Sequence, residues 1–196
     1  MKWEILSRRP LYRGFFEFLH YRVRHTRFDG GMNGPIEREL LSQRPAVAVL
    51  PYDPLSDRVV LIEQFRIGAL AAEGGPWLTE IIAGIIEPGE AAEDVARREA
   101  LEEAGCELLA LQRIHHYLPS PSSSDEQLSL YVGRVDSTGI GGLHGLPEEG
   151  EDIRVRVVDT AEAFALLDRG IINSAIPIIA LQWLRLNREA LRADWG

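Results

Sequence analysis

The chain has 196 residues, of which 45% are hydrophobic, and its formal net charge is -9, so it can bury one sizeable core without a second independent domain. The acidic balance and the scattered basic residues argue against a nucleic-acid partner, and no run reaches the roughly 18 apolar residues of a membrane span. The single cysteine, Cys106, excludes an intrachain disulfide, and the first residues lack the apolar region of a secretory signal, so we expect a cytoplasmic protein with no membrane partner.

The first 45 residues predict a small antiparallel β unit. Leu19, Tyr21 and Val23 alternate with polar residues, which is the period of a half-buried strand. Pro45 marks the junction with the rest of the chain. We therefore divide the chain into an N-terminal β unit, residues 1–45, and a main domain, residues 46–196.

The main domain predicts strands interleaved with helices. Apolar, β-branched runs at residues 46–52 and 58–65 predict adjacent strands, residues 77–83 lead into a helix, and residues 127–135 and 153–158 predict further strands. A capping box at Asp159 to Glu162 predicts a helix that ends near Gly170, and the last helix is expected over residues 174–191. This order favours an α/β fold in which a mixed β-sheet is layered between helices.

A turn and a helix occupy residues 87–105. Pro88 and Gly89 suit the central positions of a type II turn, so the helix should begin near Glu90. Alanines at positions 92, 96, 100 and 104 form a stripe of small side chains that would let this helix lie close against a sheet. Gly105 supplies the usual C-terminal stop.

The same helix carries an acidic face. Glu99 and Glu103 are one turn apart on one side, Glu102 lies beside them, and Arg98 can pair with Glu102 at i+4. Like charges at this spacing destabilise a helix unless a cation satisfies them, and Mg²⁺ prefers oxygen ligands. The alternative is an acidic face that is simply solvated.

Spacing decides between these two interpretations. Gly84, Glu90, Arg98-Glu99, Glu102-Glu103 and Gly105 stand at the intervals of the Nudix box, so the chain resembles the Nudix hydrolase superfamily. Residues 11–16, 60–66, 118–121, 144–146 and 151–155 resemble bacterial ADP-ribose pyrophosphatases, which hydrolyse ADP-ribose to AMP and ribose 5-phosphate. A proline 16 residues after the last box glycine is typical of that family, and Pro121 stands at this distance from Gly105.

The resemblance implies a Mg²⁺ site, with Mn²⁺ as a substitute. Its ligands would be the carbonyl of Ala83 and the carboxylates of Glu99, Glu103 and Glu151. Glu149 matches the family's proposed general base, whereas a glutamate on the helix, Glu102 held by Arg98, is the competing candidate.

The resemblance also implies a substrate site and a homodimer in which both subunits contribute to the adenine pocket. Arg66 matches a phosphate-contacting arginine. The adenine-side positions match Phe15, Phe16, Arg38 and Glu39. Contacts to the phosphates and the terminal ribose match Ile85, Ser120, Pro121, Ser122 and Glu126. The family often has Gly-Gly where this chain has Ser122-Ser123, and the serines lack the conformational freedom of glycine and add hydroxyl groups.

Two other functions stay open at this point. One is hydrolysis of another nucleoside diphosphate sugar, such as GDP-mannose; Pro121 and the N-terminal match argue against it. The other is a Nudix-shaped sensor that binds ADP-ribose without cleaving it, and the intact glutamates at positions 99, 102 and 103 argue against that.

Overall fold

The computed structural model describes residues 1–146 and 150–196, which form two compact units. The N-terminal unit comprises residues 1–45 together with residues 118–127. The sheet unit comprises residues 46–117 and 128–196. The segment 118–127 therefore belongs with the N-terminal strands although it lies far from them in sequence.

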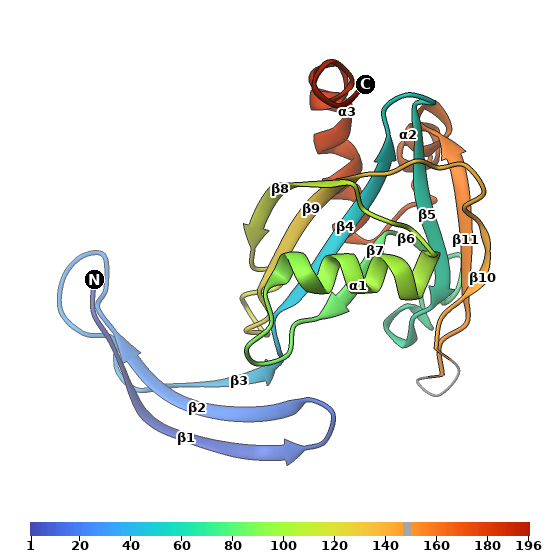
Figure 1. The fold of residues 1–196 in the computed structure, drawn as a ribbon. Helices are drawn as coiled ribbons and strands as arrows, with labels where there is room; N and C mark the ends of the chain where they lie inside the picture. Colours follow the sequence, from blue (N-terminus) through green and yellow to red (C-terminus); the bar gives the residue numbers. More distant parts are fainter. Residues whose placement is uncertain (147–149) are drawn as a thin grey trace. The chain divides into compact units, whose positions relative to one another are not determined.

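The N-terminal unit is a three-stranded antiparallel sheet in the order β1-β2-β3 (Figure 1), with β1 at Trp3–Arg13, β2 at Glu17–His25 and β3 at Ile36–Ser42. Leu19 of β2 is buried, and the alternation expected for this strand is present, because Arg22 and Arg24 are exposed. The segment 118–127 is tied to β3 by backbone hydrogen bonds, including one from the Leu41 amide to the Ser123 carbonyl at 2.8 Å.

The sheet unit is built on one mixed sheet. Its main path runs β10-β11-β5-β4-β9-β8, while β6 pairs with β5 and β7 with β4. Only the β4–β9 pair is parallel among the pairings of this sheet in the described chain. The strand bounds are β4 Ala46–Asp53, β5 Arg58–Phe65, β6 Trp77–Glu80, β7 Ile82–Ile85, β8 Ala110–Tyr117, β9 Leu128–Arg134, β10 Gly142–His144 and β11 Ile153–Asp159.

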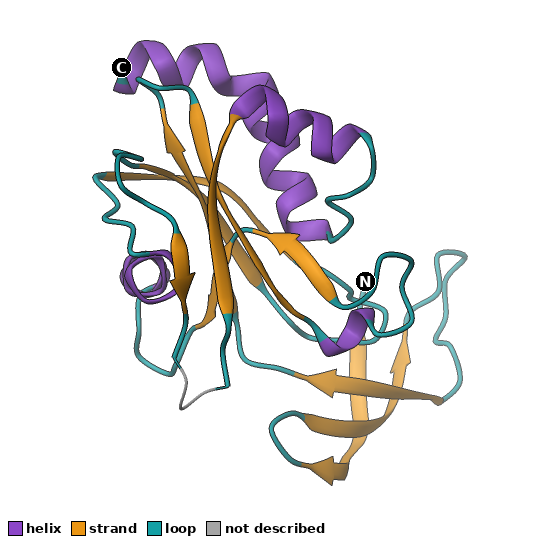
Figure 2. Cartoon of the chain, turned by 90° about the vertical axis from the view of Figure 1, so that its right-hand side faces the viewer, coloured by secondary structure: helices purple, strands orange, loops and turns teal. Residues whose placement is uncertain are grey.

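Helices cover both faces of this sheet (Figure 2), with α1 at Ala92–Ala104 on one face and α2 at Thr160–Asp168 and α3 at Ala175–Trp195 on the other. Strand alternation directs Leu50 and Leu61 into the core beneath α2 and α3, and Val49 and Ile62 into the core beneath α1. The α/β fold with a mixed sheet between helices is thereby confirmed. No helix in the described ranges is long and apolar enough to cross a membrane.

The turn and helix at residues 87–105 form as the sequence predicts. Gly89 has a φ of 94° and the Glu90 amide donates to the Glu87 carbonyl at 3.0 Å, which closes the turn. Ala96, Ala100 and Ala104 are buried against the sheet. Gly105 takes the left-handed conformation that ends α1.

One expectation for the sheet unit is wrong in detail. The capping box at the start of α2 does not form, since Asp159 makes no side-chain cap and instead accepts a hydrogen bond from Arg58 Nε at 3.0 Å. Glu162 pairs with Arg156 at 3.2 Å. Ion pairs to neighbouring arginines thus replace the local capping hydrogen bonds. The stretch 77–83, which leads towards α1, contains β6 and the start of β7, and these two strands pair with different neighbours.

A buried carboxylate fixes the turn between β4 and β5. Asp53 accepts hydrogen bonds from the Ser56 and Ser137 hydroxyls, both at 2.7 Å, and from the amides of Leu55, Ser56 and Ser137. Burial alone would raise the pKa of Asp53, but these hydrogen bonds outweigh it and hold the pKa well below its ordinary value of 3.8.

We expect Asp53→Asn to lower the free energy of unfolding at pH 7 by about 2–3 kcal/mol, because the amide nitrogen cannot accept the buried donors. A carboxyl group whose folded pKa is depressed stabilises the fold above its unfolded pKa and loses that contribution as pH falls. Urea unfolding of the wild-type protein should therefore become easier as pH drops below about 4, and Asp53→Asn should show less of this dependence. Asp168→Asn is the control, because Asp168 forms an exposed pair with Arg185. Equal effects of the two substitutions would contradict the prediction.

Candidate active site

The most deeply buried carboxylate of α1 is Glu103, which is 2% exposed. Its Oε2 accepts a hydrogen bond from the Ala83 amide of β7 at 3.1 Å. Burial raises the pKa of Glu103 to about 8, the Ala83 hydrogen bond opposes the rise, and the charges of Glu99 and Glu151 add to it. Three acidic groups from α1 and the segment before β11 therefore act on one another electrostatically.

Glu99 lies one helical turn before Glu103 and is mostly buried. Burial raises the pKa of Glu99 to about 7; the charge of Arg98, whose Nη1 is 2.9 Å from Oε1, opposes the rise, and Glu102 and Glu151 reinforce it. A carboxylate that is both desolvated and surrounded by like charges is poised to accept a cation.

Gly84 leaves the space that the Glu99 carboxylate occupies. A Cβ atom at position 84 would lie 2.1 Å from Glu99 Oε1 and 2.2 Å from its Cδ. Gly84 is not one of the described glycines whose φ is positive. The glycine is needed here for close approach to α1 rather than for an unusual backbone conformation.

Gly84→Ala is consequently expected to displace the Glu99 carboxylate. If Glu99 ligates a metal ion, as the resemblance implies, turnover should fall by roughly 10- to 100-fold, the usual effect of disturbing the support of a metal ligand. The fold should persist, because the displaced atoms belong to the flexible end of a side chain. Turnover and urea unfolding should be measured together.

Gly68→Ala is the matched control for this substitution, because a Cβ at position 68 meets nothing within 4 Å. Unchanged turnover in Gly84→Ala, or an equal loss in Gly68→Ala, would show that the carboxylate's position does not depend on this glycine.

Arg98 joins the two flanking carboxylates of the helix. Its Nη1 is 3.0 Å from Glu102 Oε2, as the i+4 spacing predicts, as well as close to Glu99. Glu102 is the more exposed of the two partners. Arg98 therefore restrains Glu102 at the edge of the acidic cluster.

Glu151 is fixed where the chain enters β11. Its Oε2 accepts a hydrogen bond from the Leu146 amide at 3.3 Å, and its own amide donates to the Leu146 carbonyl at 3.2 Å. Gly145, with a φ of 99°, allows this approach, since a Cβ there would lie 2.9 Å from the Cβ of Glu151. Glu149, the predicted general base, lies outside the described residues.

The acidic cluster suits a hard divalent cation by its chemistry, since all its side-chain donors are carboxylate oxygens. Within residues 1–146 and 150–196, however, no three His, Cys, Asp or Glu side chains are already arranged as a metal centre. The Glu99, Glu103 and Glu151 carboxylates instead contact Arg98, the Ala83 amide and the Leu146 amide.

Two predicted phosphate-side residues also belong to the sheet unit. Arg66 follows β5 directly, and its Nε donates to Glu80 Oε2 at 2.7 Å. Its charge partly offsets the effect of burial on the pKa of Glu103, so the guanidinium lies within electrostatic reach of the acidic cluster. Ile85 is the partly buried last residue of β7.

The phenylalanines predicted for the adenine site lie in the turn between β1 and β2. Phe15 is 72% exposed and Phe16 is 39% exposed, so neither ring is part of a core. The two rings meet edge to face at 4.8 Å between centroids, and the Arg44 guanidinium is 5.7 Å from the centre of the Phe15 ring. An exposed aromatic face beside a cation is suited to stacking a base.

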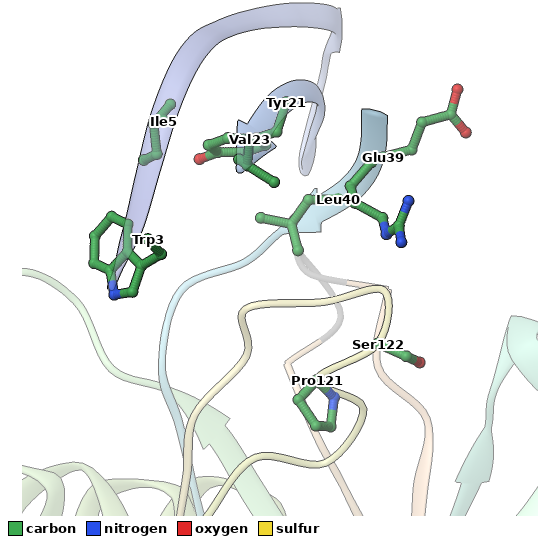
Figure 3. A pocket seen from close by; sticks show the side chains of 9 residues that line it. Trp3, Ile5, Tyr21, Val23, Glu39, Leu40, Pro121 and Ser122 are labelled. Carbon is green, nitrogen blue, oxygen red and sulfur yellow. The ribbon is translucent and has the colours of Figure 1, made fainter. Parts of the chain in front are cut away.

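A pocket of about 510 Å³ lies within the N-terminal unit (Figure 3). It contains four of the predicted substrate residues: Arg38, Glu39, Pro121 and Ser122. The remaining lining side chains are mostly apolar and come from all three strands, namely Trp3, Ile5, Tyr21, Val23 and Leu40. The strand β3 and the segment 118–127 thus bring together residues that are more than 80 positions apart in sequence.

The serine-rich part of the segment 118–127 does not adopt the positive φ angles that favour glycine. Among the described residues other than glycine, only Asp57 has a positive φ, so Ser122 and Ser123 have ordinary backbone angles. The Ser120 carbonyl accepts hydrogen bonds from the Ser123 and Ser124 amides at 3.1 and 2.9 Å. Glu126 is partly buried, and this burial raises its pKa.

Sequence reasoning overlooked the residues that support these side chains. Glu80, the partner of Arg66, lies on the next strand and gives no local signal. Trp3 and Ile5 could have been found, because they stand two residues apart in a strand and share one face.

Comparison with known proteins identifies the family to which the chain belongs. The NUDIX domain family matches residues 42–180. The chain is 47% identical over 193 residues to an ADP-ribose pyrophosphatase of Escherichia coli K12, covering 98% of this chain and 92% of that protein. It is 30% identical over 185 residues to a GDP-mannose pyrophosphatase of Cronobacter sakazakii, covering 93% of this chain and 95% of that protein.

A solved structure described as an ADP compounds hydrolase has a similar fold. It superposes with a TM-score of 0.73 at 22% sequence identity, covering 100% of this chain and 97% of that one. This likeness concerns the fold alone.

Proposed function

The chain belongs to the NUDIX family, and on that premise we propose that it hydrolyses the diphosphate bond of ADP-ribose to give AMP and ribose 5-phosphate. The observation that carries the proposal is the cluster of Glu99, Glu103 and Glu151, in which burial raises the pKa values of Glu99 and Glu103. The choice of ADP-ribose is supported by similarity to ADP-ribose pyrophosphatases over nearly the full chain.

Enzymes of this family generally depend on a divalent metal, and here Mg²⁺ is the proposed ion, with Mn²⁺ as a substitute. The proposed ligands are the Ala83 carbonyl and the carboxylates of Glu99, Glu103 and Glu151. A cation held there would neutralise the charge that develops on the phosphoryl oxygens.

The protein's own groups divide the remaining work. Arg66 would hold the diphosphate, because a guanidinium presents its donors in a plane that matches phosphate oxygens. Glu149 would take the proton from the attacking water, with Glu102, restrained by Arg98, as the competing base.

Residues of the N-terminal unit would recognise the ends of the substrate. We assign the adenine to Phe15, Phe16, Arg38 and Glu39, since aromatic faces stack bases and the polar pair can hydrogen-bond their edges. Contacts to the phosphates and the terminal ribose are assigned jointly to Ile85, Ser120, Pro121, Ser122 and Glu126.

A substrate panel tests the function. Purified protein should be incubated with Mg²⁺ and ADP-ribose, GDP-mannose or another nucleoside diphosphate sugar, and the products identified by chromatography. ADP-ribose should show the highest kcat/KM, with AMP and ribose 5-phosphate formed in equal amounts. Faster cleavage of GDP-mannose would favour the alternative substrate, and binding of ADP-ribose without cleavage would favour a sensor.

We also propose a homodimer and expect light scattering to give twice the mass of one chain. All eleven residues of β1 are exposed, Trp3 at 75% and Ile5 at 48% among them, and a strand with no buried residue is poorly stabilised on its own. A second copy of the chain would cover these side chains.

The double substitution Trp3→Ser with Ile5→Ser should shift the mass towards the monomer. Leu186→Ser is the control, because Leu186 is an equally conspicuous apolar side chain, 85% exposed on α3. A fully active wild-type monomer would exclude the dimer. A cytoplasmic location is part of the same proposal, in keeping with Cys106 as a buried free thiol.

A further inference from the structure

The guanidinium of Arg66 is hydrogen-bonded on one edge, at Nε, and in the described chain its other edge is open. Its Nε donates to Glu80 Oε2 at 2.7 Å, and within residues 1–146 and 150–196 nothing accepts a hydrogen bond from its two terminal nitrogens. Its backbone is fixed as well, because its amide donates to the Pro76 carbonyl at 2.8 Å. The outer edge of the guanidinium, which carries its remaining donors, is thus available to a ligand.

Strand register explains why Glu80 reaches this position. Ile62 of β5 is paired with Glu80 of β6, and both side chains therefore lie on the same face of the sheet. Gln64 is two residues beyond Ile62, and Arg66 continues in extended conformation two residues further, so they share that face. It is the face that α1 covers, since Ile62 packs in the core beneath α1.

Glu80 is itself supported. Its side chain is 12% exposed, and Gln64, which is buried, approaches the same Oε2 with its Nε2 at 3.5 Å. A mostly buried carboxylate bonded to a charged donor has little freedom to rotate, and it presents a fixed acceptor to Arg66.

We propose that Glu80 is a positioning residue, which fixes Nε of Arg66 so that the terminal nitrogens are directed to the diphosphate of the substrate. The inference deepens the proposed function and rests on it. Glu80 does not touch the substrate and acts only through Arg66. A guanidinium that is already held in place loses less conformational entropy when the substrate binds. Loss of Glu80 therefore weakens binding of the diphosphate group.

The same strand pair offers a matched control. Glu63 of β5 lies on the opposite face and pairs with Arg154 of β11, with Oε2 and Nη2 2.5 Å apart. The Glu63–Arg154 and Glu80–Arg66 pairs both join a glutamate to an arginine, and their glutamates lie on the adjacent strands β5 and β6. Only the Glu80–Arg66 pair lies on the face that carries the acidic cluster. A general effect of removing a glutamate charge from these strands would appear in both Glu63→Gln and Glu80→Gln, whereas loss of a positioning role would appear in Glu80→Gln alone.

The test is a double-mutant cycle on KM and kcat. Glu80→Gln, Arg66→Ala and the double variant should be compared with Glu63→Gln, using the panel substrate that the wild-type protein cleaves fastest. Glu80→Gln should raise KM about tenfold with kcat within about twofold, because the carboxylate that held the binding group is replaced by a neutral and weaker acceptor. In the Arg66→Ala background the same substitution should raise KM no further, because both changes remove one interaction.

Three results would overturn the inference: an unchanged KM in Glu80→Gln, an equal rise in Glu63→Gln, or a full tenfold rise on top of Arg66→Ala. Failure of the proposed function is a separate outcome, visible in the wild-type panel alone. If the wild-type protein cleaves none of the compounds, the cycle is run on the calorimetric Kd of inorganic pyrophosphate with Mg²⁺, and absence of coupling between positions 66 and 80 there overturns the role of Glu80.

Discussion

Glu103→Gln should lower kcat by on the order of 10³-fold, equivalent to about 4 kcal/mol of transition-state stabilisation, while the protein stays folded. A neutral amide is a poor ligand for a hard cation. The amide oxygen can still accept the hydrogen bond from the Ala83 amide, so the contact between α1 and β7 survives. Turnover across a Mg²⁺ titration measures the effect.

Stability should move in the opposite direction to activity. A carboxyl group whose pKa burial raises from 4.5 to about 8 binds its proton more tightly in the folded state, so its contribution to stability is lost as pH rises from 4.5 towards 8. Glu103→Gln removes that loss and should be at least as stable as the wild-type protein at pH 8.

Glu93→Gln is the control for this substitution, because Glu93 is an exposed residue in the first turn of α1. Wild-type turnover of Glu103→Gln at every Mg²⁺ concentration would remove Glu103 from the metal site. A similar loss of turnover in Glu93→Gln would show that removing any carboxylate from α1, and not the loss of a metal ligand at position 103, lowers activity.

Glu149→Gln is the second substitution with a large expected effect. If Glu149 is the general base, its amide keeps the size of the side chain but cannot accept the proton, and kcat should fall by roughly 10²- to 10⁴-fold with little change in substrate or metal affinity. Single-turnover kinetics at saturating Mg²⁺ isolate the chemical step.

Two comparisons separate a base from a ligand. Glu151→Gln should weaken the response to Mg²⁺ and recover part of its activity in excess metal, because Glu151 is a proposed ligand. Glu102→Gln should remove the charge from its pair with Arg98 but retain most of its turnover. If Glu102→Gln is crippled and Glu149→Gln cleaves at near the wild-type rate, the base is on the helix.

Local sequence signals were sufficient to predict α1 and the turn that precedes it. Pro88 and Gly89 impose a turn by their own backbone preferences, and Gly105 ends the helix for the same reason. The alanine stripe depends only on the helical repeat. These features require no knowledge of the remaining chain, and all of them are present in the structure.

The features that sequence reasoning missed depend on distant partners. The strand β8 has only one buried residue, Ile114, beside a register shift between Arg113 and His115, so it has no clean alternation to recognise. The capping box at Asp159 was wrong because Arg58, a hundred residues away, takes the carboxylate. Glu80 likewise acquires its partner through the pairing of β5 with β6.

The membership of residues 118–127 in the N-terminal unit bears on how such enzymes could be re-engineered. Asp125 accepts hydrogen bonds from the Ser42 hydroxyl and the Gln43 amide, both at 2.8 Å, so this segment and β3 are built to match. A chimera that takes only the first 45 residues from a relative would separate Ser42 and Gln43 from the segment that evolved beside them. On the proposed assignment of the adenine to this unit, an exchange of nucleotide preference would require the two separate stretches of sequence to be transplanted together.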